Sequence, residues 1–238
     1  AELSAGTDKY LRATVDGNFI LDEANGVALR INAMAHRNDE PGRDRAKSKR
    51  WGVNPVLGVG LGGDTQATIG YFFLRQDDLP DMGIPNARNR SLAGSGFEGV
   101  AAPVRRRNYY GYSTDYRDVE THIASLIVSH RFSDAMAISN KTRWAQTDYA
   151  QSASSPRFVG NVTTLGPATE VVGNRKFRDQ RDELFVHQTQ LELTLGGDRF
   201  RHNIVAGFEY ADESTSDRRR LDANGPRLNL FNPAFLPA

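Results

Sequence analysis

Residues 10–36 read YLRATVDGNFILDEANGVALRINAMAH and decide the fold. Leu11, Val15 and Phe19 fall on one face of the first half, and polar residues occupy the positions between them. After residues 22–26 (DEANG), apolar residues again take every second position. A period of two over such lengths is typical of β-strands, and Asp, Asn and Gly favour a tight turn. The stretch therefore predicts a β-hairpin.

The same alternation recurs along the chain. It is found in residues 51–61, 67–73, 118–132, 136–150, 182–195 and 199–212. Most of these segments are about twice as long as the ~5–6 residues of an average strand in a soluble protein. A strand of about twelve residues tilted by ~45° spans about 28 Å, close to the thickness of a bilayer's hydrocarbon core. The segments therefore favour membrane-spanning strands.

The connections between these segments alternate between short and long. The short ones are residues 22–26, 62–64, 133–135 and 196–198. The long ones are residues 39–48, 78–116, 151–181 and 213 onward. In an up-and-down meander, alternate connections lie on opposite sides, and outer-membrane barrels have short turns on one side and long loops on the other. We therefore predict all short turns at one edge of the sheet; the alternative is a soluble β-sandwich.

The composition excludes several other classes. The formal charge is +1, from 30 Lys and Arg against 29 Asp and Glu, which argues against a nucleic-acid partner. No apolar run reaches the ~18–20 residues of a membrane helix, and Cys is absent. The sequence begins at Ala1 rather than Met, so we expect a processed, trimmed or internal piece of a longer protein.

Motifs of enzyme chemistry are weak. Residues 58–63 (GVGLGG) match a dinucleotide-binding pattern, but the next segment alternates like a strand, whereas that motif requires a helix. The five histidines are scattered singly and show no metal-ligand spacing. We therefore expect no enzyme activity, no catalytic residue and no metal ligand.

The candidate ligand-binding residues lie in the longest connection. They are three arginines and three tyrosines: Arg105, Arg106, Arg107, Tyr109, Tyr110 and Tyr112. Guanidinium groups beside phenol rings can hold an anionic aromatic ligand through charge, cation–π contact and stacking. The alternatives are a solvated arginine run and tyrosines at the membrane interface. Residues 218–220 form a second, weaker arginine run.

The alternation also assigns faces. We predict one shared, convex, lipid-side face for nine apolar residues: Leu11, Val15, Ile31, Val53, Leu57, Ile69, Phe73, Ile204 and Phe208. A shift of one residue in register would invert this assignment.

Four stretches resemble the barrel of TonB-dependent siderophore receptors, especially of the catecholate type. They are residues 6–18, which open with GTD and end with LRATVDGN, residues 42–55 (GRDRAKSKRWGVNP), residues 77–85 (DDLPDMGIP) and residues 203–210 (NIVAGFEY). The resemblance implies an antiparallel meander that forms part of a 22-stranded transmembrane barrel around a plug domain. Residues 1–238 contain about nine expected strands and no candidate plug, so we expect a fragment from the N-terminal part of the barrel.

The resemblance also implies a function. It predicts a receptor in the outer membrane of a Gram-negative bacterium that imports a ferric siderophore with energy from the TonB complex, which acts on the plug. The expected partners are the siderophore, the TonB complex and outer-membrane lipid. Iron would arrive already held by the siderophore, so no cofactor is expected. The alternative function is a passive channel or an adhesion barrel without energy coupling.

Overall fold

The protein is a single layer of antiparallel β-strands. A computed structural model describes residues 1–86, 101–197, 199–221 and 223–238, and these residues contain no helix, so no described helix could cross a membrane. The strands are β1 (Glu2–Ala5), β2 (Leu11–Asp22), β3 (Val27–Asp39), β4 (Lys47–Val59), β5 (Thr65–Leu79), β6 (Tyr116–Ser133), β7 (Met136–Phe158), β8 (Glu170–Gly197), β9 (Phe200–Leu221) and β10 (Arg227–Asn229). The predicted all-β meander of long strands is confirmed.

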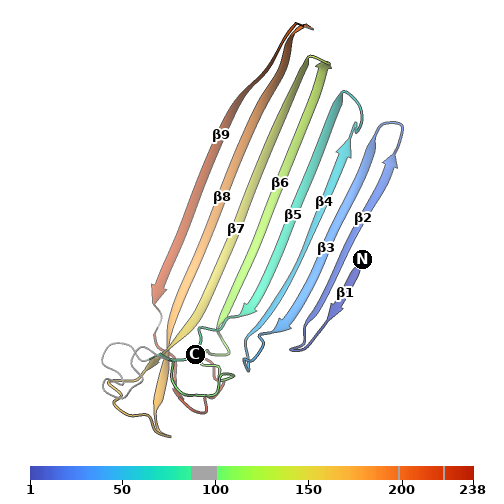
Figure 1. Ribbon diagram of the computed structural model, residues 1–238. Helices are drawn as coiled ribbons and strands as arrows, with labels where there is room; N and C mark the ends of the chain where they lie inside the picture. The colour runs from blue at the N-terminus through green and yellow to red at the C-terminus, as the bar shows by residue number, and fades with distance from the viewer. Residues whose placement is uncertain (87–100, 198, 222) are drawn as a thin grey trace.

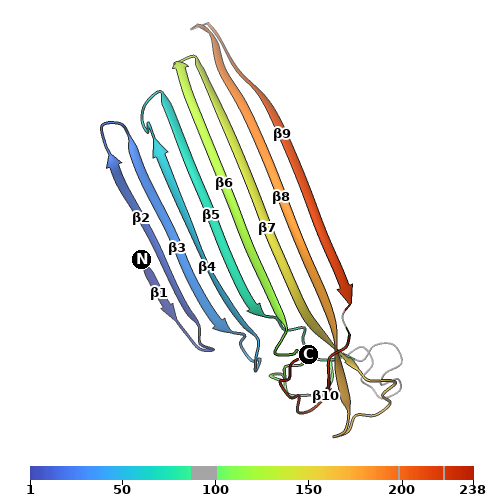
Figure 2. The same cartoon turned by 180° about the vertical axis from the view of Figure 1, so that it is seen from behind.

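Each strand from β1 to β9 pairs with its neighbour in sequence (Figures 1 and 2). The short β10 also pairs with β8, so β8 has two partners on one side. Residues 170–172 of β8 pair with β10, and residues 176–197 pair with β9. The short β10 was not predicted, because three residues are too few for alternation to be detected.

The four short turns that follow β2, β4, β6 and β8 lie at one edge of the sheet, and the long connections lie at the other, together with the five-residue connection between β1 and β2 (Figure 1). We call these the turn edge and the loop edge. The predicted sidedness is confirmed, although residue 198 of the last turn lies outside the described residues. The turn after β2 packs closely against the turn after β4. Gly26 in the first turn has φ of 60°, and a Cβ there would lie 2.4 Å from the carbonyl oxygen of Leu61 in the second. Only glycine combines that φ with that approach at little cost.

The register confirms that the nine predicted residues share one face. Residues directly opposite each other in antiparallel strands point to the same side. Leu29 lies opposite Leu57, Leu57 opposite Ile69, and Ile69 opposite Leu126, so one apolar row runs across four strands. Ile69 is 52% exposed because no second sheet covers this apolar face, which rules out the sandwich for the described residues.

The predicted limits of the long connections need correction. Residues 151–181 are not one loop, because β7 continues to Phe158 and β8 begins at Glu170. Likewise β9 runs to Leu221, so the arginine run at residues 218–220 belongs to a strand. We call the parts of β7, β8 and β9 at the loop edge their outer ends. Polar side chains occupy both faces of these outer ends, so the sequence does not alternate there, but the backbone pairing continues.

Candidate ligand-binding site

The connections at the loop edge fold together and contain most of the fully buried residues. We call this region the loop assembly; its described parts are residues 40–46, 80–86, 101–115, 159–169 and 223–238, with the outer ends of β7 and β8. Its larger core consists of Ala102, Tyr110, Tyr112, Val171, Leu228 and Leu230. Tyr112 is 0% exposed and Tyr110 1%. The loops are therefore packed against one another like the interior of a small domain.

Phenol groups tie distant segments of this assembly together. The hydroxyl of Tyr112 donates to the carbonyl oxygen of Pro226 at 2.7 Å and accepts the backbone N–H of Gly173 at 2.8 Å. The hydroxyl of Tyr110 donates to the carbonyl oxygen of Leu230 at 2.6 Å. Each bond satisfies a buried polar group that would otherwise cost free energy. The tyrosines thus fix the last residues of the chain to the longest connection.

A buried carboxylate fixes the same connection to β7. One oxygen of Asp115 accepts the backbone N–H groups of Tyr112 at 3.2 Å and Ser154 at 3.1 Å, and the other accepts the hydroxyl of Ser154 at 2.8 Å. Burial raises the pKa of Asp115 above its ordinary value, because loss of water disfavours the charged form. Burial likewise raises the pKa of Tyr109, whose hydroxyl donates to the carbonyl oxygen of Pro80 at 3.0 Å.

An ion pair joins the connection between β3 and β4 to the longest connection. The side chains of Arg43 and Asp81 form this pair and are only 10% and 15% exposed. Arg43 also donates to the carbonyl oxygen of Arg106. Beside it, Nε of Arg107 donates to Asp44 at 2.7 Å. Two residues of the predicted arginine cluster are therefore held in place, one through its backbone and one through its side chain.

The structure separates the predicted cluster into two groups. Arg105, Arg106 and Arg107 are exposed, whereas Tyr109, Tyr110 and Tyr112 are buried. The six side chains therefore do not form one surface patch, and the tyrosines support the loop assembly from inside. No observation tests ligand binding by the arginines, which stays a prediction.

Part of the predicted combination does occur, in a hollow of about 390 Å³ that we call the loop hollow. Its lining includes Arg45, Arg105, Tyr109 and Phe235. The guanidinium of Arg45 lies 5.0 Å from the ring centroid of Phe235, and the rings of Tyr109 and Phe235 meet edge to face at 5.9 Å. Two guanidinium groups, two aromatic rings and the carboxylate of Asp44 therefore line one space. Arg45 and Phe235 were not among the predicted site residues.

The second arginine run does not form a free basic patch. Arg219 pairs with Asp217 at 2.5 Å, and Arg178 of β8 pairs with the same carboxylate at 3.1 Å. The guanidinium of Arg220 lies over the ring of Phe177 at 3.9 Å from its centroid. These contacts fasten the outer end of β9 to β8.

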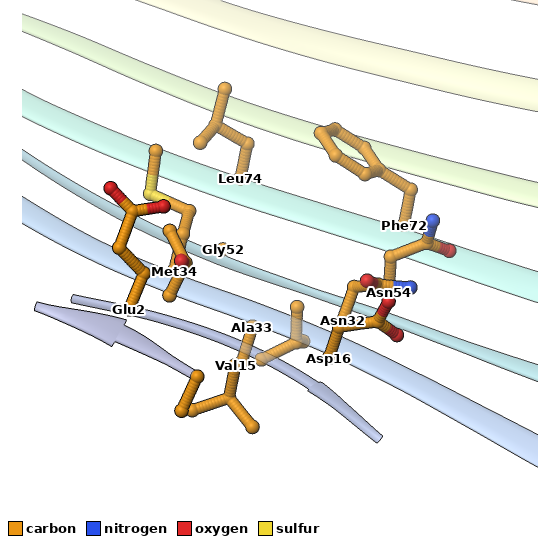
Figure 3. Close-up of a pocket in the computed structure, with 13 residues that line it drawn as sticks. Glu2, Val15, Asp16, Asn32, Ala33, Met34, Gly52, Asn54, Phe72 and Leu74 are labelled. Atoms are coloured by element: carbon orange, nitrogen blue, oxygen red, sulfur yellow. The ribbon is translucent and has the colours of Figure 1, made fainter. Parts of the chain in front are cut away.

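A larger hollow of about 700 Å³ lies on the sheet itself, against β2 to β5 (Figure 3). Asp16, Asn32 and Asn54 come from three successive strands, and Figure 3 shows them beside Phe72. The register places these residues on the face opposite the apolar rows. This face is polar and hollowed, as the inner wall of a barrel would be, so we call it the inner wall.

Long strands, one apolar face, one hollowed face with polar residues and packed loops at a single edge together define the wall of an outer-membrane β-barrel. No family model matches the sequence. The chain is 26% identical over 245 residues to the catecholate siderophore receptor Fiu of Escherichia coli K12, covering 98% of this chain and 31% of that protein. It is 33% identical over 217 residues to the probable TonB-dependent siderophore receptor PiuA of Acinetobacter baumannii, covering 90% of this chain and 28% of that protein.

The fold agrees with these similarities. The crystal structure of Fiu from E. coli K12 in its closed form matches with a TM-score of 0.83 and 24% identity, over 99% of this chain and 34% of that one. The chain thus spans about a third of the length of the relatives it matches. The predicted resemblance to the barrel of TonB-dependent siderophore receptors is confirmed, and so is the outer-membrane location.

Proposed function

We propose that this chain is part of the barrel wall of an outer-membrane receptor that imports a ferric siderophore with energy from the TonB complex. The observation that carries the proposal is similarity over 98% and 90% of the chain to proteins named as siderophore receptors. In this proposal the plug domain, which contacts the TonB complex, and the remaining strands of the barrel lie outside these residues. The function is binding and transport without a covalent step, and the iron is cargo rather than a cofactor.

The geometry suits each part of this function. The apolar rows through Leu57 and Ile69 would contact lipid, and the inner wall around Asn32 and Asn54 would face the lumen. The loop assembly would lie on the outer side, where ligands arrive, because long loops of such barrels point outward. A packed loop assembly keeps a binding surface in one conformation and lowers the entropy lost on binding.

The loop hollow is the proposed first contact for the siderophore. A ferric catecholate is anionic and presents flat aromatic faces. Arg45 and Arg105 supply positive charge at the hollow, and Phe235 supplies a ring for stacking. Tyr109 lines the same hollow and is largely buried, and its hydroxyl donates to the carbonyl oxygen of Pro80.

Uptake of radioactive iron tests the proposed function. The gene is deleted in its host and restored on a plasmid, and uptake of ⁵⁵Fe bound to a catecholate siderophore is measured with and without a functional TonB protein. We expect uptake to require both the gene and TonB. Uptake that persists without TonB, together with entry of unrelated small solutes, would instead indicate a passive channel.

Replacement of Arg45 and Arg105 by Gln in the complete receptor should weaken ferric-catecholate binding roughly tenfold at low salt, as loss of about 1.4 kcal/mol would produce. The difference should shrink at high salt, because salt screens exposed charges. Isothermal titration at two salt concentrations measures both effects. Arg106→Gln is the matched control, since the Arg106 side chain is exposed and does not line the loop hollow.

The triple replacement of Arg105, Arg106 and Arg107 by Gln tests the wider arginine cluster in the same assay. A loss no larger than that of Arg105→Gln would restrict the binding role to the loop hollow. Unchanged affinity in every variant would move the binding site to the inner wall or to the plug.

A further inference from the structure

A second basic hollow lies where the apolar face of the sheet meets the loop edge. Its volume is about 510 Å³, and its charged lining residues are Lys9, Arg37, Lys47, Lys49 and Asp39. We call it the rim hollow. It is separate from the loop hollow, and neither the arginine cluster nor the proposed transport function uses it.

The register places the rim hollow on the apolar face. Arg37 lies opposite Leu11 on one side and opposite Lys49 on the other. The next row toward the turn edge on the same face pairs Ala35 with Trp51. The cations of the rim hollow therefore stand directly beyond the last apolar row.

An aromatic pair marks this boundary. The rings of Trp51 and Phe73 lie 4.9 Å apart, and Trp51 is 46% exposed. Aromatic residues of this kind concentrate at the membrane–water interface, where an apolar ring meets polar headgroups. If the apolar rows contact lipid, as the proposed function requires, the rim hollow lies at the depth of the headgroups.

The charges of the rim hollow are unbalanced. Lys9 pairs with Asp39 at 2.5 Å, but Arg37, Lys47 and Lys49 are exposed and form no ion pair with any described residue. Asp77 lies opposite Lys49 in register, yet its carboxylate pairs with Arg75, at 3.4 Å.

Two other cations on the same face are paired. Arg75 pairs with Glu120 at 3.0 Å, and Arg181 pairs with Asp148 at 2.6 Å. Like-charged side chains repel one another, so three unpaired cations on two adjacent strands offer a site for an anion that joins them.

We infer that the rim hollow binds the phosphate of an anionic outer-leaflet lipid, whose acyl chains lie along the adjoining apolar rows. This inference rests on the proposed function, in which the apolar rows contact lipid. Lys and Arg bind phosphate through charge-assisted hydrogen bonds, and basic hollows beside membrane-spanning segments recognise anionic headgroups. A lipid matches both the basic hollow and the apolar rows beside it. Its phosphate binds Arg37, Lys47 and Lys49, and its acyl chains cover Leu11 and the apolar rows toward the turn edge.

The test uses the complete receptor purified in a neutral detergent. Native mass spectrometry measures binding of phosphatidic acid and, separately, of phosphatidylcholine to the wild type and to a variant with Arg37, Lys47 and Lys49 replaced by Gln. We expect the wild type to bind phosphatidic acid about tenfold more tightly and the variant to lose this preference. Arg75→Gln, a paired cation on the same face, is the matched control and should keep the preference.

Two results would overturn the inference. One is an unchanged preference for phosphatidic acid in the triple variant. The other is stabilisation by inorganic phosphate, measured by thermal unfolding, that equals the stabilisation by phosphatidic acid, because the acyl chains would then play no part. Uptake of ferric siderophore is measured in parallel and should survive in the triple variant. A receptor that selects anionic lipid but imports no siderophore would contradict only the proposed function.

Discussion

Replacement of Tyr112 by Ala is expected to unfold the loop assembly while the strand ladder stays intact. The ring lies between two glycines: a Cβ at Gly173 or at Gly225 would come within 2.4 Å of its atoms. Truncation of a fully buried aromatic side chain costs about 3–5 kcal/mol. It also leaves the carbonyl oxygen of Pro226 and the N–H of Gly173 without their phenol partner.

Hydrogen exchange measures this effect segment by segment. Amides of residues 101–115 and 223–238 should exchange much faster in Tyr112→Ala, whereas amides of β2 to β6 should keep their protection. Tyr112→Phe keeps the ring and loses only the hydroxyl, so it should cost about 1–3 kcal/mol. Gly225→Ala introduces the clash from the other side and should act in the same direction as Tyr112→Ala. If the amides of the loop assembly keep their wild-type protection in all three variants, Tyr112 does not hold the loop assembly together.

Replacement of Ile69 by Arg is expected to block stable insertion of the barrel. Ile69 lies in the middle of the apolar rows, between Leu57 and Leu126. An arginine facing lipid near the middle of the bilayer costs about 2–4 kcal/mol in such barrels. Thr68→Arg is the matched control, because Thr68 is the adjacent residue and points to the inner wall.

Refolding of the complete receptor into vesicles over a urea series measures the cost. Ile69→Arg should shift the midpoint to lower urea, and Thr68→Arg should shift it much less. If the two variants shift the midpoint equally, the apolar rows are not the lipid-facing side, and the assignment of faces is wrong.

The strand faces could be predicted because they depend on a local rule. Alternation in residues 10–36 requires only that one side of each strand be apolar, and the turn residues then fix which strands are neighbours. The outer ends of β7 and β8 could not be predicted in this way. Residues 152–156 are buried among the loops rather than exposed to lipid, so their sequence carries no alternation although their backbone remains paired.

Only some of the residues that line the loop hollow could be predicted, for a different reason. Arg105 and Tyr109 are close in sequence, and their residue types suggest a ligand. Arg45 and Phe235 come from the connection between β3 and β4 and from the end of the chain, and only tertiary packing brings them to the same space. The burial of Tyr110 and Tyr112 was also not predictable, because a tyrosine suits a binding surface and a core equally well.

The pairing of each long strand with its neighbour in sequence has a consequence for the time course of folding. Hairpins such as β2–β3 close loops of a few residues, so the ladder can grow one hairpin at a time with little entropy lost at each step. The bond from Tyr110 to Leu230 joins residues 120 positions apart and must wait until β6 to β9 are in place. We therefore expect insertion and maturation to be separate kinetic phases, so that a newly inserted wall passes through a stage in which it is anchored but its loop assembly is not yet packed.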